Sequence, residues 1–377
     1  MGAAQVPDPS MWVLPGARGV RDARVVAVGG DGIGPEVVAA ALECLAVAAP
    51  ELRVVQPIQG AEAIARHGKA FPAELEQELA AADAILFGAA DTERGHAKAI
   101  LQYLRWVRES YANLRPTATL PGVPGLTGQE RGANLVIVRE LTEGLYPGRE
   151  GDLALLAAGI PDYRDRMGRA LPAKGAFALR IVTEGASRRI GAYAARLAAH
   201  RKALGVAPGR VTIVTKQNVL PETDGLFRSA CEAEIAAVGG LDVDHLYVDE
   251  AARRMVAQLD SFDVVVTTNL FGDVLSDVAS EAMGGLPLAP SAAVGDGWAY
   301  FESCHGSAPD LAGRGVANPA ATILSAAMML NYLGLPEAGR RLVAATVATI
   351  ASGVRTRDLG GSAGTGAFTA EVCRRLG

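Results

Sequence analysis

The chain of 377 residues is longer than one compact core usually needs, so two domains or one large α/β unit are expected. Its net charge of −5 argues against a nucleic-acid surface, and four scattered cysteines indicate neither a disulfide framework nor a zinc site. No apolar stretch is long enough to span a bilayer and no signal peptide pattern begins the chain, so we predict a cytoplasmic protein with no membrane partner.

The elements expected along the chain follow an α/β pattern. Residues 1–22, rich in proline and glycine, are predicted to form a flexible N-terminal arm. Strand and helix signals then alternate. Apolar runs predict strands at residues 24–28, 84–87, 135–138, 211–214 and 264–266, and helices are predicted at 37–48 and 187–204. Residues 147–176 fit neither pattern and are interpreted as an insertion or as an arm between subunits.

A glycine-rich turn, GGDGIGPE, follows the first predicted strand. It does not match the dinucleotide-binding fingerprint, because Pro35 stands where a small residue is required and no ribose-binding acid follows the next strand. It is not a P-loop, because it lacks the G-K-[ST] ending. The turn by itself therefore favours a simple strand-to-helix connection.

Arginines, a lysine and a tyrosine form a second group of candidates. Arg105, Arg115 and Arg139 suit a polyanionic substrate if they converge, because guanidinium groups bind carboxylates through paired hydrogen bonds. Lys216 follows the strand 211–214, and ligands of open α/β sheets collect at the carboxyl ends of strands. Tyr146 is either a packed aromatic or a proton donor. Taken singly, each is more typical of the surface, a loop or the core.

Two aspartates, Asp273 and Asp277, lie four residues apart in VVVTTNLFGDVLSD. Residues 267–269 offer turn and N-cap chemistry, so a helix is expected to begin near Leu270. Both carboxylates would then share one helical face and repel each other unless a cation lies between them. Spacing alone leaves a divalent metal site and a solvated acidic face as equal alternatives.

The segment HGSAPDLAGRGVANP is a long loop near the C-terminal end. A loop of this length in a compact enzyme is usually functional. Its backbone donors, acid and amide are groups that an adenosine moiety needs.

Jointly, these motifs resemble a known family. GDGIGPEV, YANLRP, VRELTEGLY, TKQNVL, TTNLFGDVLSD and HGSAPDLAGRGVANP occur in the order found in the β-decarboxylating dehydrogenases. That family includes isocitrate, 3-isopropylmalate, homoisocitrate and tartrate dehydrogenases. The resemblance extends from about residue 24 to the end, and LQYLRWVRESYANLRP and RTRDLGGSAGTGAF look most like homoisocitrate dehydrogenase.

The resemblance implies an isopropylmalate dehydrogenase-like two-domain α/β fold whose cofactor site is not of the Rossmann type. It assigns residues 23–112 and 284–377 to a large, cofactor-binding domain and residues 113–283 to a small, dimerisation domain. It further implies a homodimer whose active sites are shared between the subunits. The expected activity is the oxidative decarboxylation of a 2-hydroxy acid.

Site roles are also implied by the resemblance. Asp273 and Asp277 would bind Mg²⁺ or Mn²⁺ together with Asp249 of the partner subunit. Lys216, also from the partner subunit, would help to remove the hydroxyl proton, and Tyr146 would protonate the enolate that remains after CO₂ departs. The substrate carboxylates would be held by the three arginines at 105, 115 and 139.

The cofactor is expected to be NAD. Asp310 matches the position at which NAD-dependent members carry an acid for the ribose hydroxyls, and an acid there would repel a 2′-phosphate. Leu311 follows it, whereas NADP-dependent members tend to place a lysine followed by a tyrosine. The expected cofactor-binding residues are His305, Gly306, Ser307, Ala308, Asp310, Asn318 and Asp358.

Substrate choice in this family is set mostly on the helix before YANLRP. Isopropylmalate enzymes carry apolar residues there, whereas this chain has Lys98, Leu101 and Gln102. A 3-substituted malate with a polar or anionic substituent is therefore predicted, similar to homoisocitrate or isocitrate. Two departures from the homoisocitrate pattern keep alternatives open. Gln102 stands where an arginine is expected, and Ser303–Cys304 stands where the family usually has Pro-Val. The alternatives are 3-isopropylmalate and a phosphonate-bearing malate analogue from specialised metabolism.

Overall fold

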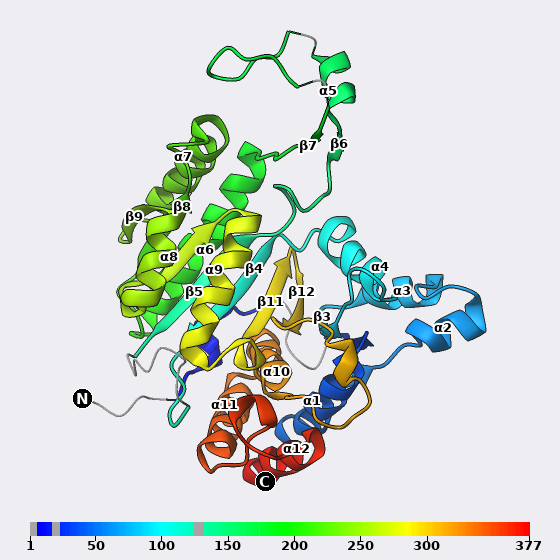
Figure 1. The fold of residues 1–377 in the computed structure, drawn as a ribbon. Coiled ribbons are helices and arrows are strands. Elements are labelled where there is room, and N and C mark those ends of the chain that lie inside the picture. Colours follow the sequence, from blue (N-terminus) through cyan, green and yellow to red (C-terminus); the bar gives the residue numbers. More distant parts are fainter. Residues whose placement is uncertain (1–5, 17–22, 124–131, 161, 173) are drawn as a thin grey trace.

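The computed structural model describes residues 6–16, 23–123, 132–160, 162–172 and 174–377. A ten-stranded sheet lies at its centre (Figure 1). Its strands are β1 (Val25–Gly30), β2 (Val54–Val55), β3 (Ala84–Ala89), β4 (Ala112–Ala118), β5 (Asn134–Glu140), β8 (Arg210–Thr215), β9 (Asp242–Tyr247), β10 (Val264–Thr267), β11 (Pro290–Gly295) and β12 (Trp298–Ser303).

The strand order is β2-β1-β3-β12-β11-β4-β5-β10-β8-β9. Pairing is parallel towards both edges, and β11 is antiparallel to both of its neighbours, as is β4. Strands from residues 23–112 and 284–377 form one side of the sheet, and those from 112–283 form the other. The predicted α/β class is confirmed.

Helices cover both faces of this sheet. The longer ones are α1 (Gly34–Ala48), α2 (Gly60–His67), α3 (Ala73–Ala81), α4 (Lys98–Gln102), α5 (Leu153–Gly159), α6 (Glu184–Ala203), α7 (Pro221–Val238), α8 (Val248–Ala257), α9 (Asn269–Ser280), α10 (Ala320–Tyr332), α11 (Pro336–Ala351) and α12 (Thr365–Leu376). Short helical turns are η1 (Pro9–Met11), the π-helix η2 (Tyr103–Val107), η3 (Leu259–Ser261), η4 (Glu281–Met283), η5 (Leu286–Leu288), η6 (Pro309–Leu311) and η7 (Arg357–Leu359).

Alternating strand residues supply the two faces of the core. On β5, Val136 and Val138 pack in one cluster with α6, whereas Leu135 and Ile137 pack in another with α8 and α9. Successive side chains of a strand point to opposite faces, so a strand covered on both sides is apolar throughout. This is why the sequence shows continuous apolar runs at these strands.

The predicted strands and the three predicted helices are all present, and the helix expected near Leu270 begins at Asn269. The helix expected at 37–48 begins earlier, at Gly34, because Pro35 fits the first turn of a helix. The helix expected at 187–204 begins at Glu184, where the Thr183 hydroxyl accepts a hydrogen bond from the backbone of Ala186 at 3.3 Å. The sequence therefore predicts the positions of these two helices but not their first turns.

The prediction of a flexible arm is wrong for residues 6–16. Trp12 and Val13 are fully buried in the main core cluster. The Asn331 side chain donates a hydrogen bond to the Val13 carbonyl at 3.1 Å, and Arg201 donates one to the Met11 carbonyl at 2.9 Å. Burial of a tryptophan stabilises this segment more than its proline and glycine content loosens it. The rest of the predicted arm lies outside the described residues.

The segment 147–176 forms much of a projection that extends away from the body of the molecule (Figure 1). Its strands β6 (Glu150–Asp152) and β7 (Ala176–Ala178) pair in an antiparallel two-stranded sheet. Helix α5 has no buried residue, and Leu155 is 69% exposed. The segment is therefore an insertion into the small half of the fold, and its place between subunits stays a prediction.

Within the ranges described above, no helix is both long enough and apolar enough to cross a membrane.

Candidate active site

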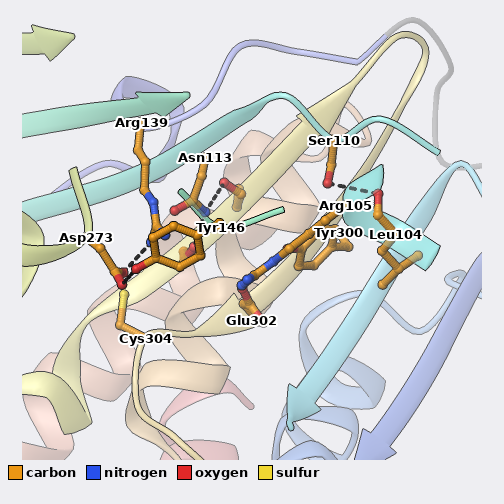
Figure 2. A network of polar contacts seen from close by, with 12 residues as sticks. Leu104, Arg105, Ser110, Asn113, Arg139, Tyr146, Asp273, Tyr300, Glu302 and Cys304 are labelled. Atoms are coloured by element: carbon orange, nitrogen blue, oxygen red, sulfur yellow. Dashed lines mark hydrogen bonds and ion pairs between the residues drawn. The ribbon is translucent and has the colours of Figure 1, made fainter. Parts of the chain in front are cut away.

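Arg139, Tyr146 and Asp273 meet at one end of the sheet (Figure 2). Arg139 lies near the carboxyl end of β5 and pairs with Thr267, after which α9 begins. Its guanidinium donates to Asn269 Oδ1, from Nε at 2.9 Å and from Nη2 at 2.6 Å, and to the Asp273 carboxylate. The Tyr146 hydroxyl donates to the other oxygen of Asp273. Three predicted site residues are thus joined in one network.

A close approach between α9 and β5 makes this network possible. A Cβ atom at Gly272 would lie 2.7 Å from both Cβ and Cγ of Arg139. Arg139 is only 1% exposed, so its side chain has little room to move. A glycine is therefore required where the helix crosses the arginine.

Charge and burial set the protonation states of this network. Burial disfavours the ionised form of Asp273, but the neighbouring Arg139 guanidinium and the Tyr146 hydroxyl outweigh it and lower the pKa of that carboxyl. Burial and the Asp273 carboxylate raise the pKa of Tyr146, although Arg139 opposes this shift. The tyrosine is therefore held protonated, as a proton donor must be.

Asp273 and Asp277 share one face of α9, as predicted. The pKa of Asp277 is raised by burial and by the Asp273 carboxylate, although Arg115 opposes the shift. Two neighbouring carboxylates, one of which raises the pKa of the other, form a donor set that suits a divalent cation. In the part of the chain that the structure describes, no three acidic, histidine or cysteine side chains converge as a metal site. One chain therefore offers two of the three predicted ligands.

Arg115 lies on β4 and is buried. Its Nε donates to Asn113 Oδ1 at 2.8 Å, and the Asn113 amide donates in turn to Ser291 Oγ at 2.9 Å. Burial raises the pKa of the nearby Cys304 thiol to about 11, although Arg115 opposes the shift, so the thiol stays protonated near neutral pH. Arg115 is thus a buried cation whose Nε is fixed by a neutral amide.

Arg105 comes from the π-helix η2 and faces β12 (Figure 2). Its Nε donates to the Tyr300 hydroxyl at 3.4 Å, and its Nη2 lies 3.8 Å from Glu302 Oε1. Burial disfavours its charged form, but Tyr300 and Glu302 outweigh burial and raise the pKa of Arg105. Arg115 and Arg139 are thus buried, Arg105 is partly buried, and all three are charged on the same side of the sheet.

Lys216 and Asp249 meet each other. The Lys216 ammonium donates to the Asp249 carboxylate, and its backbone N–H donates to Asp224 Oδ2 at 2.5 Å. Within the described ranges, no hydrogen bond or ion pair connects this pair with Asp273 or Asp277.

The three residues expected to select the substrate lie on α4. Lys98 and Gln102 are exposed on successive turns, whereas Leu101 is buried in the second core cluster. Asp31 in the glycine-rich turn positions the loop before this helix. Its carboxylate accepts hydrogen bonds from the backbone N–H groups of Asp91, His96 and Ala97 at 2.9–3.0 Å.

A cavity of about 890 Å³ lies beside the predicted cofactor loop. Of the residues predicted to bind the cofactor, those that line it are His305, Gly306, Ala308, Asn318 and Asp358. Ser307 is buried behind it, where its carbonyl accepts from the Ile33 N–H at 2.8 Å, and Asp310 is exposed in η6.

Two features of this cavity suit a polar ligand. His305 Nε2 is buried and has no hydrogen-bond partner among the described residues, whereas Nδ1 lies 3.0 Å from the Gly306 carbonyl. Asn318 donates to Asp358 Oδ2 at 2.8 Å, which fixes both side chains at the wall. An unpaired buried nitrogen is costly unless a bound molecule satisfies it.

Comparisons with known proteins place this chain in a family. Residues 24–375 match the model of the isocitrate/isopropylmalate dehydrogenase family. An isocitrate/homoisocitrate dehydrogenase of Thermus thermophilus is 41% identical over 94% of this chain and 98% of that protein. A 3-isopropylmalate/3-methylmalate dehydrogenase of Methanocaldococcus jannaschii is 40% identical over 94% of this chain and 98% of its own length.

The chain belongs to the isocitrate/isopropylmalate dehydrogenase family. The structure of isocitrate dehydrogenase from Methylococcus capsulatus superposes with a TM-score of 0.80 at 32% identity, over 94% of this chain and 99% of that one. The predicted family and fold are therefore confirmed. The chain is an oxidoreductase of the decarboxylating dehydrogenase type, which acts on small hydroxy acids.

The sequence does not reveal the site role of several residues. Asn269 was expected to act in the helix start, yet its side chain binds Arg139 and the Glu143 carbonyl. Tyr300 and Glu302 contact Arg105 and were not predicted. The available signal was the two-residue period of β12, which places both on one face of that strand.

Proposed function

We propose that this protein catalyses the NAD-dependent oxidative decarboxylation of a 3-substituted malate, with Mg²⁺ or Mn²⁺ as the metal. The observation that carries the proposal is the gathering of two buried arginines, Arg115 and Arg139, and the partly buried Arg105 beside the Asp273–Asp277 pair at one end of the sheet. Buried guanidinium groups need carboxylate partners, and a malate supplies two. Exposed Lys98 and Gln102 favour a polar or anionic third substituent, as in homoisocitrate or isocitrate.

A homodimer would complete the metal site. Asp273 and Asp277 would be joined by Asp249 of the partner subunit, and Lys216 would come from the same partner subunit. An apolar strip on α9 supports this arrangement, because Leu270 and Val274 lie one turn apart and are 39% and 55% exposed. A second copy packed on this strip would lie beside the aspartates.

The resemblance to the family assigns a role to each of these residues. A divalent ion, when bound, would supply Lewis-acid stabilisation of the negative charge that develops on the substrate oxygen. Lys216 of the partner subunit would help to remove the hydroxyl proton, and NAD, when bound, would supply the hydride acceptor. The resulting β-keto acid would lose CO₂, and Tyr146 would return a proton to the enolate carbon. The arginines would hold the carboxylates through both steps.

NAD would occupy the cavity beside the cofactor loop. The unpaired His305 nitrogen and the Asn318–Asp358 pair suit the adenosine moiety. Asp310, although it does not line the cavity, would disfavour a 2′-phosphate nearby. NAD is therefore proposed over NADP.

The test is the formation of NADH with Mg²⁺ or Mn²⁺ and a panel of 3-substituted malates. The panel contains homoisocitrate, isocitrate, 3-isopropylmalate and a phosphonate-bearing malate. We expect the highest kcat/KM with homoisocitrate or isocitrate. A preference for 3-isopropylmalate or for the phosphonate would replace the proposed substrate, and no NADH with any of them from a folded dimer would overturn the proposal.

A further inference from the structure

Tyr300 is a buried tyrosine whose only polar contact in the described chain is with a substrate-site arginine. Its ring is fully buried, and its hydroxyl accepts from Arg105 Nε at 3.4 Å. Phe87 contacts the ring edge to face at 6.5 Å between centroids, and Trp298 stacks on it at 6.2 Å. The ring is therefore held on two sides, which fixes the direction of the hydroxyl.

Arg108, at the C-terminal end of η2, also contacts β12. The Arg108 guanidinium lies 3.8 Å from the centre of the Trp298 ring and donates to the Ala82 carbonyl at 3.1 Å. Arg105 and Arg108 both belong to the turn of η2, where the backbone bond from Arg108 to Tyr103 spans five residues. A π-helical turn displaces its side chains from ordinary α-helical positions. Aromatic side chains of β12 thus contact both Arg105 and Arg108 of this turn.

We propose that Tyr300 is a positioning residue that orients Arg105 for a substrate carboxylate. Glu302 lies 3.8 Å from Arg105, beyond hydrogen-bonding distance, so it balances charge without fixing the guanidinium. The Tyr300 hydroxyl holds Nε and leaves the two terminal nitrogens for a carboxylate. This inference rests on the proposed function, because the carboxylate in question belongs to the hydroxy acid.

The experiment compares wild type, Tyr300→Phe, Arg105→Lys and the double variant. For the hydroxy acid with the highest wild-type kcat/KM, Tyr300→Phe should raise KM by about fivefold to tenfold, with kcat within about twofold of wild type. In the Arg105→Lys background the same change should have almost no further effect, because Tyr300 acts through Arg105. Tyr332→Phe, which alters another buried tyrosine, is the matched control and should leave KM unchanged.

Two further measurements distinguish a positioning role of Tyr300 from a loss of stability, and distinguish failure of this inference from failure of the proposed function. The dissociation constant for NADH, measured by fluorescence, should be unchanged in Tyr300→Phe. A crystal structure of this variant should show the Arg105 guanidinium displaced, and this holds whether or not any hydroxy acid is turned over. An unmoved guanidinium, an unchanged KM, or an equal effect in the Arg105→Lys background would overturn the inference. An inactive wild type would instead count against the proposed function.

Discussion

The crossing of α9 over Arg139 allows a sharp prediction for Gly272→Ala. The new Cβ would lie 2.7 Å from two Arg139 carbons, whereas carbon atoms pack at about 3.5–4.0 Å. Arg139 or the helix must therefore shift by about 1 Å, and a misplacement of this size at a substrate-binding group costs on the order of 100-fold in rate. We expect kcat/KM to fall by about that factor.

The effect on stability should be much smaller. Overpacking costs about 1–3 kcal/mol, and alanine favours a helix over glycine by about 0.5–1 kcal/mol, so the net loss is about 0–2.5 kcal/mol. Initial rates of NADH formation and urea unfolding measure the two quantities. Gly185→Ala is the control, because Gly185 also lies in a helix and a Cβ there would have no neighbour within 4 Å. Wild-type kcat/KM in Gly272→Ala would refute the reasoning.

Three further predictions concern the N-terminal segment, the metal and the substrate. Trp12→Ala should lower the free energy of unfolding by about 3–5 kcal/mol in urea, with Val6→Ala as an exposed control; a loss below about 1 kcal/mol would mean that the segment does not anchor the fold. Asp273→Asn and Asp277→Asn should each abolish metal-dependent turnover and Mn²⁺ binding; urea unfolding should stay near wild type in Asp277→Asn, whereas Asp273→Asn also removes the charge that pairs with buried Arg139 and should be less stable. Surviving turnover would mean that the metal site is misplaced. Gln102→Leu should raise the kcat/KM ratio of 3-isopropylmalate to homoisocitrate by about tenfold, and an unchanged ratio would contradict the assignment of α4 as the selecting helix.

Much of the site could be predicted because its residues lie in contiguous motifs. The strand before TTNLFGDVLSD and the helix within it place Asp273 and Asp277 by local signals alone. Arg139 and Tyr146 lie in one short segment that ends a strand, so their approach to Asp273 follows from parallel pairing of β5 and β10.

Other features depend on contacts between distant segments. From the sequence alone, Tyr300 looks like an aromatic that packs in a buried strand. Its role depends on Arg105 of η2, which contacts it only in the folded chain. The composition of residues 6–16 suggests a loose arm, yet Trp12 is buried in the main core cluster. The hydrogen bond between Asn331 and Val13 joins this segment to a helix more than three hundred residues away in sequence. Such tertiary contacts override local preference.

The order of strands in the sheet has a consequence for synthesis on the ribosome. β11 and β12, residues 290–303, lie between β3 and β4, so the apolar edge of β3 stays unpaired until the chain is nearly complete. The strands β4, β5, β10, β8 and β9 adjoin one another and are all made before β11 emerges. Domains fold as units while the nascent chain grows, and unpaired edges favour aggregation. The half that contains the first strands, β1 to β3, is therefore completed last, and β11 then pairs with β4 of the half that is already made.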